Sequence, residues 1–327
     1  MFLMRIDEAM KAILTVTMII LCTMYLPLSD CQLTVGFYDQ ACPSAESMVA
    51  DVVAAATASN SRLPAQLLRL HFHDCFVQGC DGSILIDNGP NSEKNAFAHQ
   101  GLAGFDVIDA AKARLEGVCP GVVSCADVLA MAARDAVALS NGPRYQVRTG
   151  RRDGFVSDQS MAAIMPDVDD SIQTLKAKFQ NQGLNDQDLV LLSAAHTIGT
   201  GACFFMPNRL YNFATTGSSD PSINPLFLQE LQQICPQGGD VNVRLPLDRG
   251  SEFTFDNHIL QNVREGFAVL ASDAKLYDDQ STRTFVDMYV DGSSFRRDFV
   301  TAMTRMGQLG ALTGAAGEIR RVCSAFN

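Results

Sequence analysis

The 327-residue sequence contains no tryptophan, which excludes any chemistry that needs an indole side chain to carry an electron. It contains no Cys-x-x-Cys pair, and this argues against a zinc ribbon or zinc finger. No Asn-x-Ser/Thr sequon occurs, so we expect an unglycosylated protein. Basic residues are scarce, 25 against 36 acidic ones, which disfavours nucleic acid and anionic polymers as partners.

Long apolar runs are also rare, and the clearest extends from Ala12 to Leu28. It follows a basic residue and is followed by small residues, as is typical of a secretory signal peptide cleaved before Gln32. The run is too short, and its flanks too poor in charge, to favour a membrane anchor. The start lies at Met1 or at Met10. We expect the new terminal glutamine to cyclise to pyrrolidone carboxylic acid.

Removal of residues 1–31 leaves an even number of cysteines, which in a secreted chain indicates disulfides. Eight cysteines allow about a hundred pairings, and their spacing alone does not choose among them. An apolar content of 47% supports a substantial core. Because no repeat, low-complexity tract or linker is present, we expect residues 32–327 to form a single domain.

Apolar residues at helical spacing predict a mainly α protein. Glycine, asparagine and proline predict a long loop at 79–101 and a loop-rich region at 215–249. A weak alternation over Tyr145–Thr149 allows at most a small β-hairpin. The expected helices, with their capping and stop residues, are Pro43–Ala58, Leu63–Phe76, Gly104–Glu116, Ser124–Ser140, Ser171–Gln182, Asn185–Ala195, Asp256–Glu265, Thr282–Val290 and Ser293–Met306.

The stretch Leu68–Ser83 holds the densest chemistry, L-R-L-H-F-H-D-C-F-V-Q-G-C-D-G-S. On a helix, Arg69 and His73 stand four residues apart on one face, which sets a fixed positive charge beside a base that titrates near neutrality. His196 follows a predicted helix in A-H-T-I-G. Two histidines on opposite walls of a pocket, one of them beside an arginine, suggest haem ligation and peroxide chemistry.

These motifs, with V-S-C-A-D, G-R-R-D, R-L-Y-N-F and F-D-N, resemble those of the secretory plant (class III) haem peroxidases from Gln32 to about Cys323. The resemblance implies an all-helical haem peroxidase fold in which distal and proximal lobes enclose haem b. It also implies the disulfides Cys42–Cys119, Cys75–Cys80, Cys125–Cys323 and Cys203–Cys235.

The same resemblance implies roles for single residues. His73 matches the distal base that moves a proton between the peroxide oxygens, and Arg69 matches the arginine that stabilises the developing charge. His196 matches the axial ligand of the haem iron, and Phe72 a haem contact on the distal face. Asp273, in L-A-S-D-A-K-L, matches the carboxylate that accepts the Nδ1 proton of the axial histidine.

Two calcium sites are implied as well, with the carboxylate, hydroxyl and carbonyl ligands that Ca²⁺ prefers. Loop capping explains any one of these residues equally well, but not the whole set. The distal ligands are Asp74, Val77, Gly79, Asp81 and Ser83, with Glu93 through water, and the proximal ligands are Thr197, Asp248, Ser251, Thr254 and Asp256.

The distal side departs from the family at residue 99. Where relatives have an asparagine that orients the distal histidine, this chain has Ala98-His99, and Ala103 replaces a usual arginine. A neutral His99 accepts the Nδ1 proton of His73, whereas a protonated one repels it. We therefore expect a working enzyme with slower peroxide activation or an altered acid limb in its pH profile. Comparison of the pH profiles of the wild type and His99→Asn tests this.

Three residues match positions near the substrate channel of the family: Pro166, Phe97 and Phe205. Packing explains each of them equally well.

His71 stands two residues before His73, so the two point in nearly opposite directions on a helix, which favours a structural role over zinc ligation. His258 has no functional signature and is expected on a helix surface.

The expected function is the reduction of H2O2 with oxidation of phenolic donors by successive one-electron steps, at the haem edge or through tyrosine. Such chemistry serves lignin formation, wall cross-linking, peroxide removal or the response to oxidative stress. We expect a monomer in the apoplast or cell wall, without nucleic acid or membrane partners. The alternative is a haem-binding wall protein that has lost turnover; a zinc hydrolase on H-x-H is the weakest reading.

Overall fold

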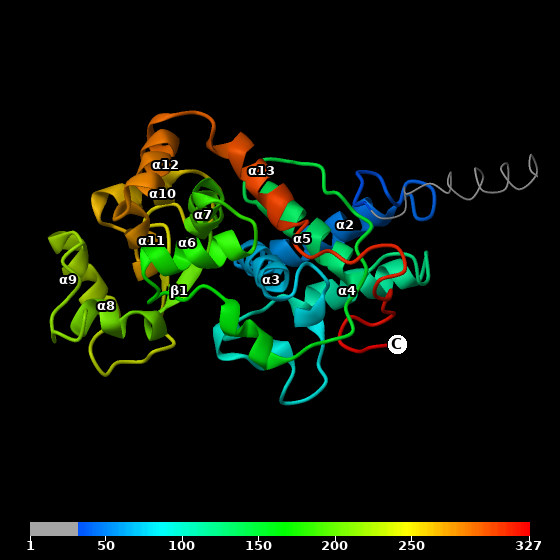
Figure 1. The fold of residues 1–327 in the computed structure, drawn as a ribbon, viewed down its shortest axis with the longest axis horizontal. Coiled ribbons are helices and arrows are strands. Elements are labelled where there is room, and N and C mark those ends of the chain that lie inside the picture. The colour runs from blue at the N-terminus through cyan, green and yellow to red at the C-terminus, as the bar shows by residue number, and fades with distance from the viewer. Residues whose placement is uncertain (1–31) are drawn as a thin grey trace, which may run out of the picture. The chain divides into compact units, whose positions relative to one another are not determined.

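The computed structural model describes residues 32–327, of which Leu33–Asn327 form one compact unit. The expected signal peptide lies outside the described residues. Helices dominate this unit (Figure 1). They are α2 (Ala45–Ser59), α3 (Leu63–Val77), α4 (Phe105–Glu116), α5 (Cys125–Leu139), α6 (Ile172–Asn181), α7 (Asp186–Ser193), α8 (Pro207–Tyr211), α9 (Pro225–Ile234), α10 (His258–Glu265), α11 (Ala271–Ala274), α12 (Gln280–Asp291) and α13 (Phe295–Met306).

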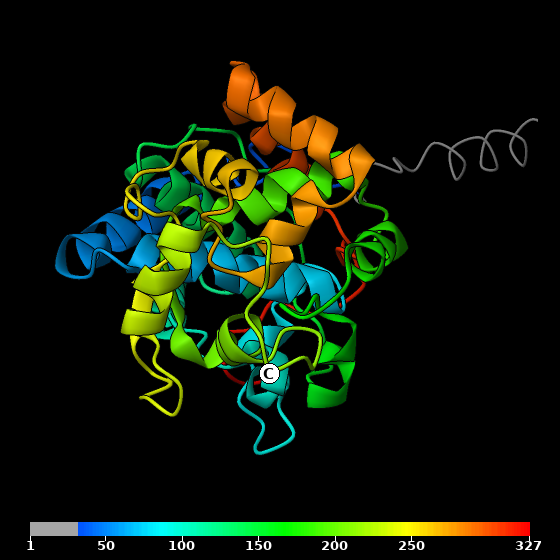
Figure 2. The same ribbon diagram turned by 90° about the vertical axis from the view of Figure 1, so that its left-hand side faces the viewer.

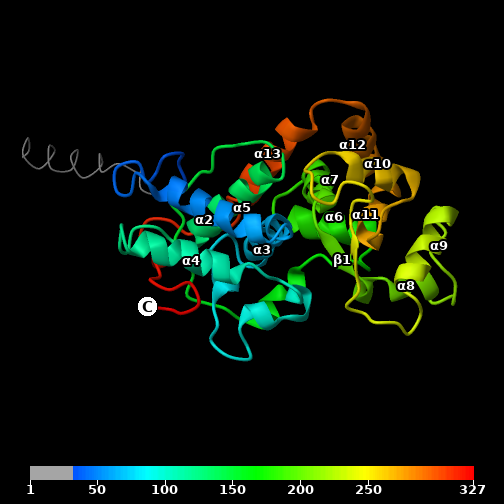
Figure 3. The same cartoon turned by 180° about the vertical axis from the view of Figure 1, so that it is seen from behind.

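Helix α3 lies in the middle of the unit. Helix α5 packs along α3, α2 packs on α5, and α4 packs on α2 and α5 (Figures 1 and 3). On the other side α7 packs against α12 and α13, and Figure 2 shows α12 above α3 in that view. Alanines make α5 narrow, and nearly all of its residues are buried, as expected for a helix with apolar residues on every side. The mainly α fold class is confirmed.

The helices predicted from sequence occur within a few residues of their expected ends, but α9 was not predicted, and the alternation at 145–149 forms no strand. The region 215–249 contains α9, which begins at Pro225 after Asn224 has capped the backbone N–H of Leu226. Proline suits the first helical position, so it opens this helix instead of marking a loop. The alternation over Tyr145–Thr149 forms no strand beyond a bridge between Thr34 and Thr149.

The sheet within the described residues is instead a pair of short strands from two loops. Strand β1 (Thr200–Ala202) runs antiparallel to β2 (Arg244–Pro246), with Gly201 opposite Leu245. Leu245 is buried beside Leu247, in the apolar cluster around α8 and α9. Burial of Leu245 in β2 therefore anchors its partner β1, the strand that follows the His196 segment. A strand of three residues is too short for a sequence pattern to reveal it.

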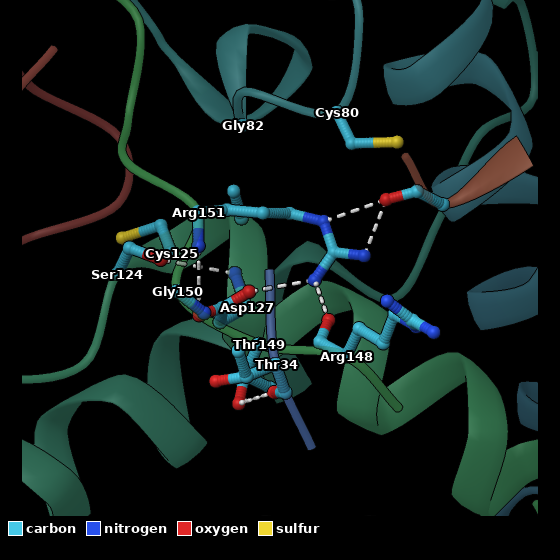
Figure 4. Close-up of polar contacts among 12 residues, drawn as sticks. Thr34, Cys80, Gly82, Ser124, Cys125, Asp127, Arg148, Thr149, Gly150 and Arg151 are labelled. Carbon is cyan, nitrogen blue, oxygen red and sulfur yellow. Dashed lines mark hydrogen bonds and ion pairs between the residues drawn. The ribbon is translucent and has the colours of Figure 1, made fainter. Parts of the chain in front are cut away.

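The motifs V-S-C-A-D and G-R-R-D build a buried polar network (Figure 4). Asp127 accepts hydrogen bonds from Tyr38 Oη (2.6 Å), Gly150 N (2.6 Å) and Arg151 Nη1 (2.7 Å). Arg151 also donates to the carbonyl of Gly307 beyond α13. A buried carboxylate needs partners of this kind, so the two motifs join segments that are distant in sequence.

The four disulfides pair as the resemblance implied. Cys125–Cys323 joins the start of α5 to the end of the chain, and Cys75–Cys80 closes the loop after α3. Among the residues described, no helix combines the length and the apolar character needed to cross a membrane.

Candidate active site

Helix α3 presents a cation and a base on one face. Arg69 Nε lies 3.1 Å from His73 Nε2, and Arg69 Nη2 donates to the carbonyl of Gln100 at 3.2 Å. The spacing of four residues brings the two side chains together, as the sequence predicted. Burial, followed by the electrostatic effects of Arg69, His99 and His196, holds the pKa of His73 well below its usual range. His73 is therefore a neutral base near pH 7.

The other ring nitrogen of His73 contacts the residue where this chain departs from its family. His73 Nδ1 and His99 Nδ1 are 2.6 Å apart, and both rings are buried. On the far side of His99, Nε2 lies 3.5 Å from Glu93 Oε1, so the Glu93 carboxylate is close to that ring nitrogen. Arg69, His73, His99 and Glu93 thus follow one another in a line.

This line is consistent with one assignment of protons. Arg69 Nε is always a donor, so His73 Nε2 must be an acceptor and His73 Nδ1 must carry the proton. His99 Nδ1 then accepts that proton, and the N–H of its Nε2 faces the Glu93 carboxylate. A cation at one end and a carboxylate at the other favour the same tautomers, which leave His73 Nε2 as the base.

The second histidine lies just after α7. Asn185 and Asp188 form a capping box at the start of that helix, which gives way to a 3₁₀ turn, Ala194–Thr197. His196 Nδ1 lies 3.0 Å from each carboxylate oxygen of Asp273, a buried residue of α11. Burial acts to lower the pKa of His196, but the charge and hydrogen bonds of Asp273 outweigh it, and the pKa is raised.

A buried arginine supports the segment that leads to Asp273. Arg209, in R-L-Y-N-F, donates from Nη1 to the carbonyls of Ala268 and Val269, at 2.6 and 2.7 Å, and from Nε to Asp220 at 3.0 Å. The motif gave no sign of this role, because the carbonyls lie about sixty residues further along the chain. Arg209 is a positioning residue for α11.

The arrangement fits a haem group. Among the described residues, His196 Nε2 has no hydrogen-bond partner, and the carboxylate on Nδ1 makes the imidazole a stronger donor to iron. The pKa of His73 responds to the charge of His196, and that of His196 to the charge of Arg69, so the two histidines lie near enough for such charges to act across the space between them. Phe72, half-buried against Phe76, lies on α3 between Arg69 and His73.

The loop after α3 gathers buried oxygen atoms. Asp74 Oδ2 accepts from Gly82 N at 3.1 Å, but among the described residues Asp74 Oδ1, Ser83 Oγ and both Glu93 oxygens are buried without a hydrogen-bond partner. Burial, then the charges of Asp81 and Glu93, raise the pKa of Asp74 well above its usual range. Crowded, unsatisfied oxygens of this kind fit a hard divalent cation. Val77 is the last residue of α3 and Gly79 lies in the loop after it, both between the disulfide-bonded Cys75 and Cys80.

The proximal set also converges. Thr197 Oγ1 lies 2.8 Å from Asp248 Oδ2 and 3.3 Å from Asp256 Oδ1. Ser251 Oγ donates to Asp256 Oδ2 at 2.7 Å, and both hydroxyls lie 3.5 Å from the carbonyl of Thr254. Five residues spread over sixty positions thus bring carboxylate, hydroxyl and carbonyl oxygens together, the mixture that Ca²⁺ prefers. Throughout the described chain, no three carboxylate, imidazole or thiolate side chains form a metal-binding group by themselves, so each shell depends on these other oxygens.

His258 has a partner that the sequence did not suggest. Its side chain is partly exposed, as expected for a helix surface, but Nδ1 lies 2.7 Å from Asp248 Oδ1. Asn262, one turn further along α10, donates to the same oxygen at 2.7 Å. The pairing depends on a loop ten residues away and has no local sequence signal.

His71 is buried against Cys75 and lines a cavity of about 20 Å³ with Arg151, away from His73.

The aromatic residues expected near the channel are clustered. Phe97 is 66% exposed, and its ring lies 5.9 Å from that of Phe204, which lies 5.2 Å from Phe205. Phe204 connects the two predicted residues and was missed, because one phenylalanine beside another gives no pattern. Pro166 is half-buried after the 3₁₀ turn Gln159–Ile164, which packs on α3 and on the Phe97 turn.

Comparison with known proteins agrees with this geometry. The sequence profile of the family described as peroxidase matches residues 49–292. The chain is 60% identical to Peroxidase 43 of Arabidopsis thaliana over 313 residues, 94% of this chain and 96% of that protein. It is 49% identical to Peroxidase N1 of Nicotiana tabacum over 298 residues, covering 90% of each, and 44% identical to Peroxidase N of Armoracia rusticana over 302 residues, covering 90% and 91%. The chain therefore belongs to the plant (class III) peroxidase family, and it is a haem peroxidase that reduces hydrogen peroxide and oxidises a donor.

Proposed function

We propose that His73 is the acid–base catalyst, Arg69 the stabiliser of charge, and His196 the axial ligand held by Asp273. Bound haem supplies the iron and the electrons that reduce the peroxide. His73 Nε2 takes a proton from one peroxide oxygen and returns it to the other, which leaves as water. Arg69 stabilises the negative charge that builds on the leaving oxygen. The contact of Arg69 Nε with His73 Nε2 carries this proposal.

The donors that we propose are small phenols, oxidised in one-electron steps at an edge near Phe97, Phe205 and Pro166. Exposed phenylalanine rings suit flat aromatic donors. Steady-state oxidation of a series of substituted phenols, with H2O2 as co-substrate, tests it. Turnover limited to inorganic donors would contradict the phenolic assignment. No observation favours the alternative of a haem-binding protein without turnover, since the distal base retains an acceptor at His99.

We further propose a monomeric protein secreted to the cell wall or apoplast, after removal of residues 1–31. Wall cross-linking, lignin formation, peroxide removal and the response to oxidative stress all use the same reaction. Purification from the extracellular fluid, followed by sequencing of the amino terminus, tests both the location and the expected start at a cyclised Gln32.

His99 is proposed to orient His73. Replacing His99 by leucine removes the acceptor of the Nδ1 proton, so we expect peroxide cleavage to slow by about 10- to 100-fold, the effect of leaving a buried donor unpaired. His99→Asn restores the amide usual in the family and should cleave peroxide faster than the wild type, with a different acid limb. Stopped-flow rates across pH measure both effects.

The control for this test is Gln100→Leu, since the Gln100 side chain is exposed and the carbonyl that binds Arg69 is retained. It should match the wild type. Rate–pH profiles that coincide for the wild type and both His99 variants would remove His99 from the mechanism.

Two calcium ions per chain are proposed, one in each oxygen cluster. A chelator should lower the melting temperature, because a ligand at a hundred times its dissociation constant stabilises the native state by about 2.7 kcal/mol. Elemental analysis should find two calcium ions in the wild type and one in Asp81→Asn. The exposed control, Asp87→Asn, should keep both. Equal melting temperatures with and without chelator would contradict the proposal.

A further inference from the structure

Two arginines near the proposed active site have no acidic partner among the described residues. Arg62, at the start of α3, and Arg244, at the start of β2, are both exposed. Neither forms an ion pair with a carboxylate among the described residues, although the chain carries 36 acidic residues against 25 basic ones. Arg244 is nevertheless held in place, since its Nε donates to Thr200 Oγ1 at 2.7 Å and its Nη2 to the Thr200 carbonyl at 2.6 Å.

The fold brings these two arginines close to Arg69. A Cβ atom added to Gly199 would lie 2.7 Å from Ala65 Cβ, so the segment leading from His196 into β1 touches α3 between Arg62 and Arg69. Gly199 also has a φ of +103°, which favours glycine. Thr200 comes next in the chain, and its hydrogen bonds hold the guanidinium of Arg244 close to this contact. The three cations therefore line the seam where β1 meets α3.

Their charges act on one another. Burial, and then the charge of Arg244, lowers the pKa of Arg69 to about 10. Burial, and then the charge of Arg62, lowers the pKa of Arg244. Three like charges that repel and have no acidic neighbour are an unfavourable arrangement in the protein alone. A guanidinium offers paired N–H donors that match a carboxylate, so an anionic ligand of that shape would relieve the repulsion.

The surface beside Arg244 indicates what the anion is attached to. Ala202 is paired with Arg244, and beyond it Cys203 N and Phe204 N bond to the carbonyls of Val243 and Val241. Phe204 therefore lies beside the strand that carries Arg244, with the exposed ring of Phe97 next to it. Aromatic rings next to a bound guanidinium fit a flat apolar molecule that carries a carboxylate.

We propose that Arg244, assisted by Arg62, binds the carboxylate of a flat aromatic ligand at the seam between β1 and α3. The proposal rests on the proposed function, in which two molecules have this chemistry: haem, through its propionates, and a phenolic acid donor. Arg244 adds a charge contact that an uncharged phenol does not use. It thus favours phenolic acids over phenolic alcohols, or strengthens the hold on haem.

The test compares Arg244→Gln and Arg62→Gln with a control, Arg114→Gln, whose arginine pairs with Asp51 on the α4 side. In the first arm, holoprotein is prepared with haem or with haem dimethyl ester, and release to excess apomyoglobin is timed. In the second arm, binding of 4-hydroxycinnamic acid and of 4-hydroxycinnamyl alcohol is titrated by the Soret difference spectrum without peroxide. Neither arm needs turnover, so failure of the proposed catalytic roles would not affect the readings.

Loss of a charged hydrogen-bond partner at an exposed site predicts a roughly 5- to 20-fold change for Arg244→Gln. Faster release of haem, but not of its dimethyl ester, would show that Arg244 binds the haem propionates. Weaker binding of 4-hydroxycinnamic acid, but not of the alcohol, would show that Arg244 binds the carboxylate of the donor. Arg244→Lys keeps the charge but not the paired donors, and should recover only part of the effect. If both arms match Arg114→Gln, the proposal is overturned.

Discussion

Replacing His73 by leucine should slow peroxide cleavage by about 10²- to 10⁴-fold, the range contributed by a positioned acid–base group. Leucine fills the site but cannot take a proton from the peroxide. Haem should remain bound, since the proposed axial ligand is His196. Stopped-flow measurement of the Soret change with excess H2O2 gives the rate. The matched control is His71→Asn, on the same helix two residues earlier and directed toward Arg151.

The acid limb of the wild type offers a second check on His73. Burial and three neighbouring cationic or imidazole groups hold its pKa well below the usual value of about 6.5. The residue accepts a proton only while neutral, so cleavage should stay fast as pH falls through 6.5 and decline only when pH reaches the lowered pKa. A limb centred at the ordinary imidazole value, or a His73→Leu rate equal to that of the control, would argue against this role.

The sequence predicted the parts of the site that are local. Arg69 and His73 are one helical turn apart, so their contact follows from helix geometry. The family resemblance supplied the distant pairs, such as His196 with Asp273, which are 77 residues apart and joined by no periodic pattern. The disulfide pairing came from the same source.

Contacts that neither a local pattern nor the resemblance indicated could not be predicted. His258 on Asp248 and Phe204 between Phe97 and Phe205 depend on how loops fold back on one another. The two-stranded sheet of β1 and β2 has three residues in each strand, too few for an alternation to be recognised. The helix α9 was hidden by prolines, one of which begins it. Loop composition indicated irregular structure but not what the loops bring together.

Replacing Asp273 by asparagine should weaken the hold on haem by about 10- to 100-fold, the usual cost of losing the partner of a metal-bound histidine. The two carboxylate oxygens, each 3.0 Å from His196 Nδ1, fix the ring and keep the proton on that nitrogen. An amide can accept the same proton through one oxygen but lacks the charge that raises the pKa of His196. The imidazole then gives less electron density to iron, so the reduction potential should rise.

Two measurements separate this effect from a general loss of structure. Spectroelectrochemical titration reports the potential, and transfer of haem to apomyoglobin reports the rate of release. Asp278→Asn is the matched control, because Asp278 is an exposed carboxylate five residues further along the same segment. A misfolded variant would release haem quickly without a defined potential, whereas a change in the axial histidine moves both together. An unchanged potential in Asp273→Asn, with haem bound, would mean that His196 does not depend on this carboxylate.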